Sequence, residues 1–167
     1  MHELILGGAR SGKSRMAEQL AVASGLAVTY IATSQALDGE MSTRIAEHQR
    51  RRPAQWGLIE EPLRREAAAG RCLLVDCLTL WLTNLLLCED QTRLARERDA
   101  LLDCLDTLPG RVILVSNETG LGVVPMGELS RRYVDLAGWL HQEVAQRCQR
   151  VLFCIAGLPM ALKGQLP

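Results

Sequence analysis

The sequence predicts an α/β domain in which a mostly parallel central sheet is covered by helices on both faces. Short apolar runs alternate with longer amphipathic runs along the chain, which is typical of parallel strands buried between two helical layers. A glycine-rich turn separates the first apolar run from the first amphipathic one. The chain has 167 residues, enough for one domain with a sizeable core. We therefore expect residues 1–167 to form a single domain.

The strands are expected where short apolar runs are bounded by turn residues. One of these runs, Ala27–Ala32, is rich in β-branched residues, and another, Val112–Ser116, is apolar until its last position. The five expected strands are Glu3–Leu6, Ala27–Ala32, Cys72–Asp76, Val112–Ser116 and Val151–Ala156.

The helices are expected in the longer amphipathic segments. Gly25 and Pro53 end the first two, because glycine and proline terminate helices. A Gly/Pro-bearing segment, Thr119–Gly127, is expected to be a loop at the carboxyl edge of the sheet, where open α/β sheets bind their ligands. The five expected helices are Lys13–Ser24, Glu40–Arg51, Leu78–Leu87, Thr92–Leu105 and Leu129–Gln149.

Charge and composition exclude several function classes. The chain has 19 basic and 19 acidic residues and no net charge, so no overall field that attracts nucleic acid is expected. The longest apolar stretch, near Leu78 to Cys88, is too short to span a bilayer, and the N-terminus does not have the pattern of a signal peptide. The six cysteines show no CxxC spacing, which favours reduced thiols in a cytoplasmic protein over a zinc site or a disulfide framework.

The glycine-rich turn carries the clearest functional signal. It has the pattern G-x4-G-K-S, follows a predicted strand and opens a predicted helix, which is the context of a P-loop. Main-chain N–H groups and the positive helix end of such a loop hold phosphates. Lys13 is expected to reach the β- and γ-phosphates, and the Ser14 hydroxyl to bind Mg²⁺. The sequence therefore predicts a RecA-like P-loop NTPase that binds ATP or GTP through Gly7-Gly8-Ala9-Arg10-Ser11-Gly12-Lys13-Ser14.

Polar residues end two of the other predicted strands. Asp76 follows the apolar run Cys72–Val75 and is expected to bind Mg²⁺, directly or through water, as a Walker B acid does. It could also serve as the N-cap of the helix that begins at Leu78. Asn117 and Glu118 are candidates for orienting an acceptor, although a polar loop edge explains them equally well.

The three histidines lie in different settings. His48 follows Arg44 and precedes Arg50–Arg52 in a predicted helix. Arginine binds phosphate oxygens, and a neutral imidazole, favoured by nearby cations, is a competent nucleophile. From spacing alone, a solvated helix end is the favoured interpretation of these arginines. His2 is expected in solvent, and His141 is expected at the surface or in helix packing.

Ordered motifs run along nearly the whole chain. They are Leu6–Arg15, Tyr30–Gln35, Asp38–Met41, Arg44-Ile45-x2-His48, Arg52-Pro53-x2-Trp56, Asp76-Cys77-Leu78-Thr79-x3-Thr83-Asn84 and Val115-Ser116-Asn117-Glu118-x-Gly120-x-Gly122-x2-Pro125. Together they resemble the bifunctional adenosylcobinamide kinase/adenosylcobinamide-phosphate guanylyltransferases of cobalamin biosynthesis. The P-loop by itself is generic, whereas the ordered set is highly specific.

The resemblance implies two reactions and an assembly. ATP or GTP phosphorylates the hydroxyl of the aminopropanol arm of adenosylcobinamide. GTP then guanylylates a histidine with release of pyrophosphate, and GMP passes to adenosylcobinamide phosphate to give adenosylcobinamide-GDP. The family also suggests a homotrimer, for which the apolar stretch Leu78–Leu87 is a candidate contact surface.

The resemblance also assigns residues. His48 matches the guanylylated position, which reverses the interpretation from spacing alone. Some relatives carry two adjacent histidines where this chain has Glu47-His48, and Asp76 stands where a glutamate can occur. Besides the P-loop, the positions that correspond to nucleotide contacts are Thr33, Ser34, Gln35, Gln49, Arg50, Arg51, Arg52, Glu60 and Asp76.

Two other functions use the same motifs. A monofunctional P-loop small-molecule kinase would need Lys13, Ser14 and Asp76 but would have no use for His48. A non-enzymatic GTP-dependent switch would bind GTP without acceptor-dependent turnover.

Overall fold

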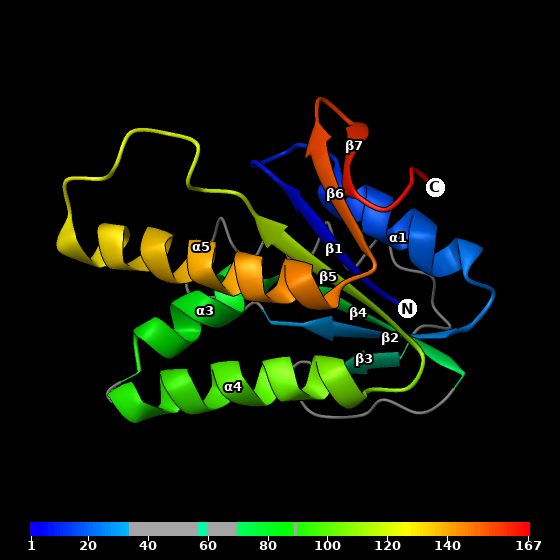
Figure 1. Ribbon diagram of the computed structural model, residues 1–167, viewed down its shortest axis with the longest axis horizontal. Helices are drawn as coiled ribbons and strands as arrows, with labels where there is room; N and C mark the ends of the chain where they lie inside the picture. The colour runs from blue at the N-terminus through cyan, green and yellow to red at the C-terminus, as the bar shows by residue number, and fades with distance from the viewer. Residues whose placement is uncertain (34–56, 60–69, 89) are drawn as a thin grey trace.

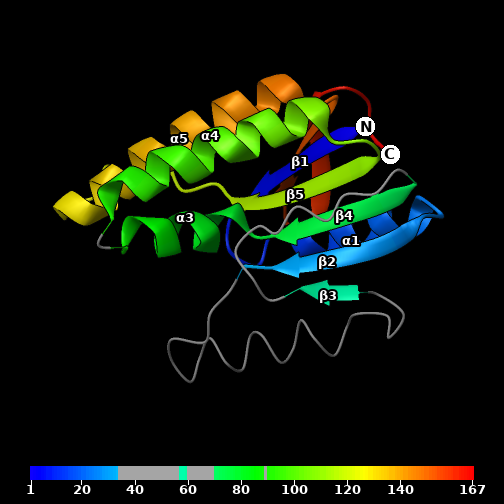
Figure 2. The same ribbon diagram turned by 90° about the horizontal axis from the view of Figure 1, so that it is seen from below.

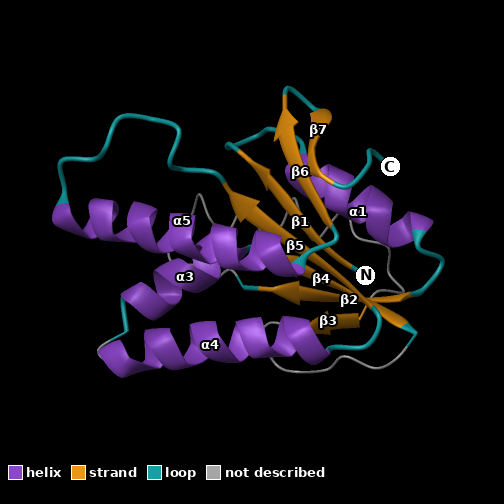
Figure 3. Ribbon diagram, viewed as in Figure 1, coloured by secondary structure: helices purple, strands orange, loops and turns teal. Residues whose placement is uncertain are grey.

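The computed structural model describes residues 1–33, 57–59, 70–88 and 90–167 (Figures 1 and 3). Strands and helices alternate along most of this part of the chain. The elements are β1 (His2–Gly7), α1 (Lys13–Ala23), β2 (Ala27–Ala32), β3 (Gly57–Ile59), β4 (Arg71–Asp76), α3 (Leu78–Leu86), α4 (Gln91–Thr107), β5 (Arg111–Asn117), α5 (Glu128–Arg147), β6 (Arg150–Ile155) and β7 (Leu158–Lys163).

The strands form one seven-stranded sheet in the order β3-β2-β4-β5-β1-β6-β7. The neighbours from β3 to β1 are parallel (Figure 2), and so are β1 and β6. β6 and β7 form an antiparallel pair at one edge (Figure 1). The predicted mostly parallel sheet is therefore confirmed. β1 lies between β5 and β6. The P-loop, which begins at the carboxyl end of β1, is therefore flanked by other strands on both sides.

Helices cover both faces of this sheet. Leu4 and Ile5 are neighbours in β1 and both are 0% exposed, yet they belong to opposite clusters of the core. Leu4 lies on the face covered by α3, α4 and α5, where Trp81 is also buried. Ile5 lies on the face covered by α1, with Leu20. Burial on both faces explains why the sequence of β1 is apolar at successive positions.

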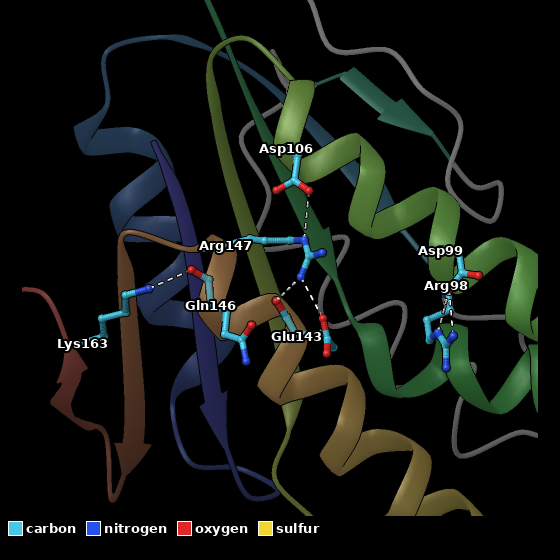
Figure 4. A network of polar contacts seen from close by, with 7 residues as sticks. All are labelled: Arg98, Asp99, Asp106, Glu143, Gln146, Arg147 and Lys163. Carbon is cyan, nitrogen blue, oxygen red and sulfur yellow. Dashed lines mark hydrogen bonds and ion pairs between the residues drawn. The ribbon is translucent and has the colours of Figure 1, made fainter.

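Polar contacts connect the ends of α4, α5 and β7 (Figure 4). Arg147 Nε donates to Asp106 Oδ2 at 3.2 Å, and Arg147 Nη1 donates to Glu143 Oε2 at 2.9 Å. Lys163 Nζ donates to the main-chain carbonyl of Gln146 at 3.0 Å, where a cation complements the last turn of a helix. Exposed ion pairs contribute little to stability, so these contacts mainly orient the helix ends.

The five predicted strands and the segment predicted as a loop, Thr119–Gly127, are confirmed, whereas β3 and β7 were not predicted. Four of the predicted helices are also confirmed, with ends shifted by one or two residues. The fifth, Glu40–Arg51, lies outside the described residues. All six cysteines are free thiols. Among the described helices, none combines the length and apolar character needed to cross a bilayer.

Two expectations about exposure were wrong. His2 is only 7% exposed, because β1 already begins at this residue and pairs with β5 there. The face of α3 proposed as a subunit contact is also buried, since Leu78, Trp81 and Leu85 pack inside this chain. The apolar sequence of α3 is thus explained without a partner subunit.

Candidate nucleotide and acceptor site

The P-loop connects the end of β1 to the start of α1. Gly12 is the N-cap of α1 and adopts the left-handed conformation, with φ 94° and ψ 0°. A Cβ atom at this position would lie only 2.9 Å from Gly157 Cα. Both the backbone conformation and the close approach therefore require glycine at position 12.

The hairpin between β6 and β7 supports the P-loop from the side. Its two-residue turn, Ala156-Gly157, has φ values of 52° and 80°, as in the turns that join twisted antiparallel strands. Gly157 N donates to Ser11 O at 2.9 Å. The P-loop was predicted from the sequence, whereas the β6–β7 hairpin that holds it in place was not.

Lys13 and Ser14 are the first two residues of α1. Lys13 Nζ donates to Gly8 O at 3.1 Å, so its ammonium group lies over the loop. A phosphate oxygen could replace this carbonyl as the acceptor. Ser11 Oγ is buried without a hydrogen-bond partner in the described protein, a further polar atom within the loop that a ligand could satisfy.

Asp76 ends β4. Its carboxylate Oδ2 accepts a hydrogen bond of 2.8 Å from the Tyr30 hydroxyl on β2. The N-cap of α3 is Cys77, without a side-chain capping bond, so the alternative role of Asp76 as N-cap is wrong. Burial and the neighbouring Asp76 carboxylate raise the pKa of Cys77 to about 11, which keeps this cysteine a neutral thiol.

The hydroxyl of Thr33 is bound within the protein. Thr33 Oγ1 accepts from Cys77 N at 2.9 Å and donates to Cys77 O at 2.6 Å, and Asn84 Nδ2 donates to Thr33 O at 3.1 Å. Thr33 is 4% exposed, so its side chain anchors the end of β2 to the start of α3. The other predicted nucleotide contacts and the proposed nucleophile lie outside the described residues: Ser34, Gln35, His48, Gln49, Arg50, Arg51, Arg52 and Glu60.

Asn117 and Glu118 lie beside the start of the P-loop. Asn117 pairs in register with Gly7, and Glu118 N donates to Gly7 O at 3.1 Å. Asn117 Oδ1 is buried and has no hydrogen-bond partner in the described protein. Asn117 and Glu118, the two candidates for orienting an acceptor, are therefore adjacent to the P-loop.

His141 of α5 contacts this region from the helical layer. Its Nε2 atom lies 2.8 Å from Ser116 Oγ, and its Nδ1 atom lies 3.7 Å from Glu118 Oε2. Burial lowers the pKa of His141, and the Glu118 carboxylate opposes this effect in part. Sequence reasoning did not connect these residues, although the spacing of the buried positions Ala137, His141 and Val144 on α5 could have indicated an inward-facing histidine.

The donor atoms present fit a magnesium ion. Ser14 supplies a hydroxyl oxygen and Asp76 a carboxylate oxygen, the hard donors that Mg²⁺ prefers. They come from α1 and β4, which pack against each other. Within the described residues no cluster of three or more His, Cys, Asp or Glu side chains is placed to hold a metal. Mg²⁺ in nucleotide sites needs fewer, because phosphates and water complete its coordination.

The sequence matches the family described as "Cobinamide kinase / cobinamide phosphate guanyltransferase" over residues 3–162. It is 73% identical to the bifunctional adenosylcobalamin biosynthesis protein CobP of Pseudomonas aeruginosa, over 99% of each chain. It is 36% identical to the bifunctional adenosylcobalamin biosynthesis protein CobU of Salmonella typhimurium, over 96% of this chain and 98% of the relative. A solved structure from Pyrococcus horikoshii has a similar fold, with a TM-score of 0.57 at 10% identity over 99% of this chain and 87% of the other.

Proposed function

Because the chain belongs to the cobinamide kinase / cobinamide phosphate guanyltransferase family, and is a bifunctional enzyme of adenosylcobalamin biosynthesis, we propose that one nucleotide site performs two successive transfers. In the first, ATP or GTP phosphorylates the aminopropanol hydroxyl of adenosylcobinamide. In the second, GTP donates GMP to the new phosphate through a histidine intermediate, which yields adenosylcobinamide-GDP. The observation that carries this proposal is the P-loop, with Lys13 over the loop at the N-terminus of α1.

In both steps the P-loop binds the triphosphate. Its main-chain N–H groups and the positive end of α1 hold phosphate oxygens, and Lys13 stabilises the negative charge that develops during transfer. Ser14 and Asp76 hold Mg²⁺, which neutralises phosphate charge when it is bound.

His48 is the nucleophile of the second step in this proposal. Its ring nitrogen attacks the α-phosphorus of GTP, a P–N bond forms, and pyrophosphate leaves. A phosphate oxygen of adenosylcobinamide phosphate then attacks the same phosphorus, and the P–N bond breaks. The support is the motif Arg44-Ile45-x2-His48 and the arginines Arg50–Arg52 that follow it, because arginine pairs with phosphate oxygens.

The remaining parts of the proposal concern assembly and location. The family resemblance supports a homotrimer. The absence of CxxC spacing among the six cysteines supports a cytoplasmic location, and the zero net charge gives no support for a nucleic-acid partner. Exposed apolar side chains favour a protein contact, and several occur together in the loop after β5, where Leu121 is 79% exposed and Val123 and Met126 are each 96% exposed.

GTP labelled in the α-phosphate tests the histidine intermediate. We expect the wild type to acquire an acid-labile, base-stable label that adenosylcobinamide phosphate removes. His48→Ala should acquire no label, yet it should still phosphorylate adenosylcobinamide and accumulate adenosylcobinamide phosphate, since that step uses the hydroxyl of the acceptor. GTP labelled in the γ-phosphate is the control and should leave no label on either protein. Sustained synthesis of adenosylcobinamide-GDP by pure His48→Ala would overturn the assignment.

A further inference from the structure

Glu118 is the first residue after β5, at the start of the loop that precedes α5. Its main-chain N–H donates to Gly7 O at 3.1 Å, and Gly7 is the last residue of β1 and the first of the P-loop. In Figure 1 this loop extends beyond the carboxyl edge of the sheet. The position of Glu118 is thus tied to the position of the phosphates that the P-loop binds.

A main-chain N–H group and an imidazole ring face the carboxylate of Glu118. Oε1 accepts a hydrogen bond of 2.6 Å from Gly120 N, and Oε2 lies 3.7 Å from Nδ1 of His141. The side chain remains 21% exposed. One carboxylate oxygen is therefore bound by the main chain, the other lies beside His141, and the side chain is accessible from the solvent side.

A chain of hydroxyl groups leads from the end of β5 to His141 and can fix the tautomer of its ring. Thr79 Oγ1 accepts from Asn117 N at 2.8 Å and lies 3.3 Å from Ser116 Oγ, which lies 2.8 Å from His141 Nε2. If Thr79 donates to Ser116 and Ser116 donates to His141, every hydroxyl proton is used, and the ring proton resides on Nδ1, facing Glu118. Burial lowers the pKa of His141, which favours the neutral ring that this arrangement requires.

We propose that Glu118 orients the acceptor hydroxyl in the kinase step, and that His141 is a positioning residue that holds Glu118 in place. This inference rests on the proposed kinase function. The acceptor is an alcohol on a flexible arm, and its hydroxyl donates a hydrogen bond to the Glu118 carboxylate. The hydroxyl oxygen then bonds to the γ-phosphorus, while the bond from that phosphorus to the β,γ-bridging oxygen breaks. The hydroxyl proton passes to Glu118, and the nucleoside diphosphate leaves.

Glu118→Gln tests the catalytic part of this proposal. The amide keeps the size of the side chain but is a poor proton acceptor, so kcat of the kinase step should fall about 100-fold. KM for the nucleotide should stay near the wild-type value, because Glu118 contacts the acceptor. Protein labelling by α-labelled GTP should persist, because that half-reaction involves no acceptor hydroxyl.

Two substitutions of His141 form a matched pair. His141→Asn places an amide N–H near the position of Nδ1 and can still donate to Glu118. His141→Gln reaches the position of Nε2 and can keep the contact with Ser116, but it loses the donor to Glu118. We expect kcat of the kinase step to fall about threefold in His141→Asn and tenfold or more in His141→Gln, since small errors in orientation are costly in transfer reactions.

The outcomes separate this inference from the proposed function. A wild type without kinase activity would defeat the proposed function itself. An active wild type with an equally active Glu118→Gln variant would overturn the role of Glu118. Equal losses in His141→Asn and His141→Gln, in folded proteins with cooperative thermal unfolding, would overturn the positioning role. Should His141→Gln fail to fold, Glu118→Gln still decides the catalytic part.

Discussion

At the amino end of the sheet, Glu3 is fully buried between two arginines, whereas at the carboxyl end Lys13 rests on a main-chain carbonyl. The Glu3 carboxylate lies 2.6 Å from Arg111 Nε through Oε2 and 3.4 Å from Arg150 Nε through Oε1. Lys13 Nζ lies 3.1 Å from the neutral oxygen of Gly8. At the amino end, a buried carboxylate is thus paired with arginines. At the carboxyl end, the Lys13 ammonium is bound only to a neutral carbonyl oxygen, which a phosphate oxygen can replace.

This difference separates charges that hold the fold from charges that bind a ligand. The carboxylate of Glu3 cannot leave its arginines without a large desolvation cost. Lys13 can leave Gly8 O for a phosphate oxygen without separating an ion pair. The tyrosine hydroxyl that donates to Asp76 is likewise a neutral partner. We therefore expect substitutions at the two ends to affect different measurements.

The largest expected effect is that of Lys13→Ala on catalysis. Both proposed reactions use the same triphosphate cradle, so both turnover rates should fall about 10²–10³-fold, equivalent to about 2.7–4 kcal/mol. The free energy of unfolding should change by less than about 1 kcal/mol, because only one exchangeable hydrogen bond is lost. Steady-state kinetics of both reactions and urea unfolding measure the two quantities.

The other lysine of the chain provides the control. Lys163 donates to carbonyls at the end of α5 (Figure 4). It pairs with Val151 near the start of β6, at the opposite end of the β6–β7 hairpin from Gly157, which contacts the P-loop. Lys163→Ala should lower stability by about 1 kcal/mol or less and leave both activities unchanged. Wild-type turnover of Lys13→Ala in either reaction would contradict a shared cradle.

Glu3→Gln should have the next largest effect, on stability. Removal of the carboxylate leaves Arg111 and Arg150 facing each other in a largely buried setting, which should cost about 3 kcal/mol of unfolding free energy. Glu143→Gln removes an exposed partner of Arg147 and should cost under about 0.5 kcal/mol. Urea unfolding followed by circular dichroism measures both. Activity per folded molecule should not change in either variant. If Glu3→Gln lowered stability as little as Glu143→Gln does, the Glu3 carboxylate would not hold the fold as proposed.

Most of the sheet could be predicted because its strands are buried on both faces and are therefore apolar at successive positions. β7 could not, since it is an antiparallel edge strand with mostly exposed residues and contains Pro159. β3 has only three residues, Gly57–Ile59, which is too short for a periodicity. Tertiary pairing, rather than local sequence preference, determines both.

Parts of the site could likewise be predicted from the sequence, and other parts could not. The P-loop could be predicted because its function is encoded in contiguous residues. The contacts of His141 with Ser116 and Glu118 could not be predicted, because they form only when α5 packs over β5. The competing role of Asp76 as N-cap was wrong for a similar reason: the neighbouring strand β2 supplies Tyr30 as a hydrogen-bond partner, and the chain turns one residue later, so that Cys77 becomes the cap.

The smallest expected effect is a pH dependence contributed by one buried histidine at each end of the sheet. Burial lowers the pKa of both His2 and His141 below the ordinary value of 6.5. The N-terminal ammonium group lowers the pKa of His2 further, whereas Glu118 raises that of His141. Below pH 6.5 the unfolded chain therefore binds more protons than the folded one, so stability falls as the pH decreases towards the folded pKa values. Well above pH 6.5 both histidines are neutral in both states, and this contribution is constant.

Urea unfolding at pH 7.5 and pH 5.5 measures this dependence in the wild type, His2→Asn and His141→Asn. Each histidine can contribute a slope of at most about 1.4 kcal/mol per pH unit, and carboxylates add a background common to all three proteins. We expect each substitution to reduce the loss of stability on acidification, because asparagine does not titrate. A variant whose stability falls as steeply as that of the wild type would show that its histidine accepts a proton as easily in the folded chain as in the unfolded one. The comparison of the two variants then identifies which end of the sheet is more sensitive to acid.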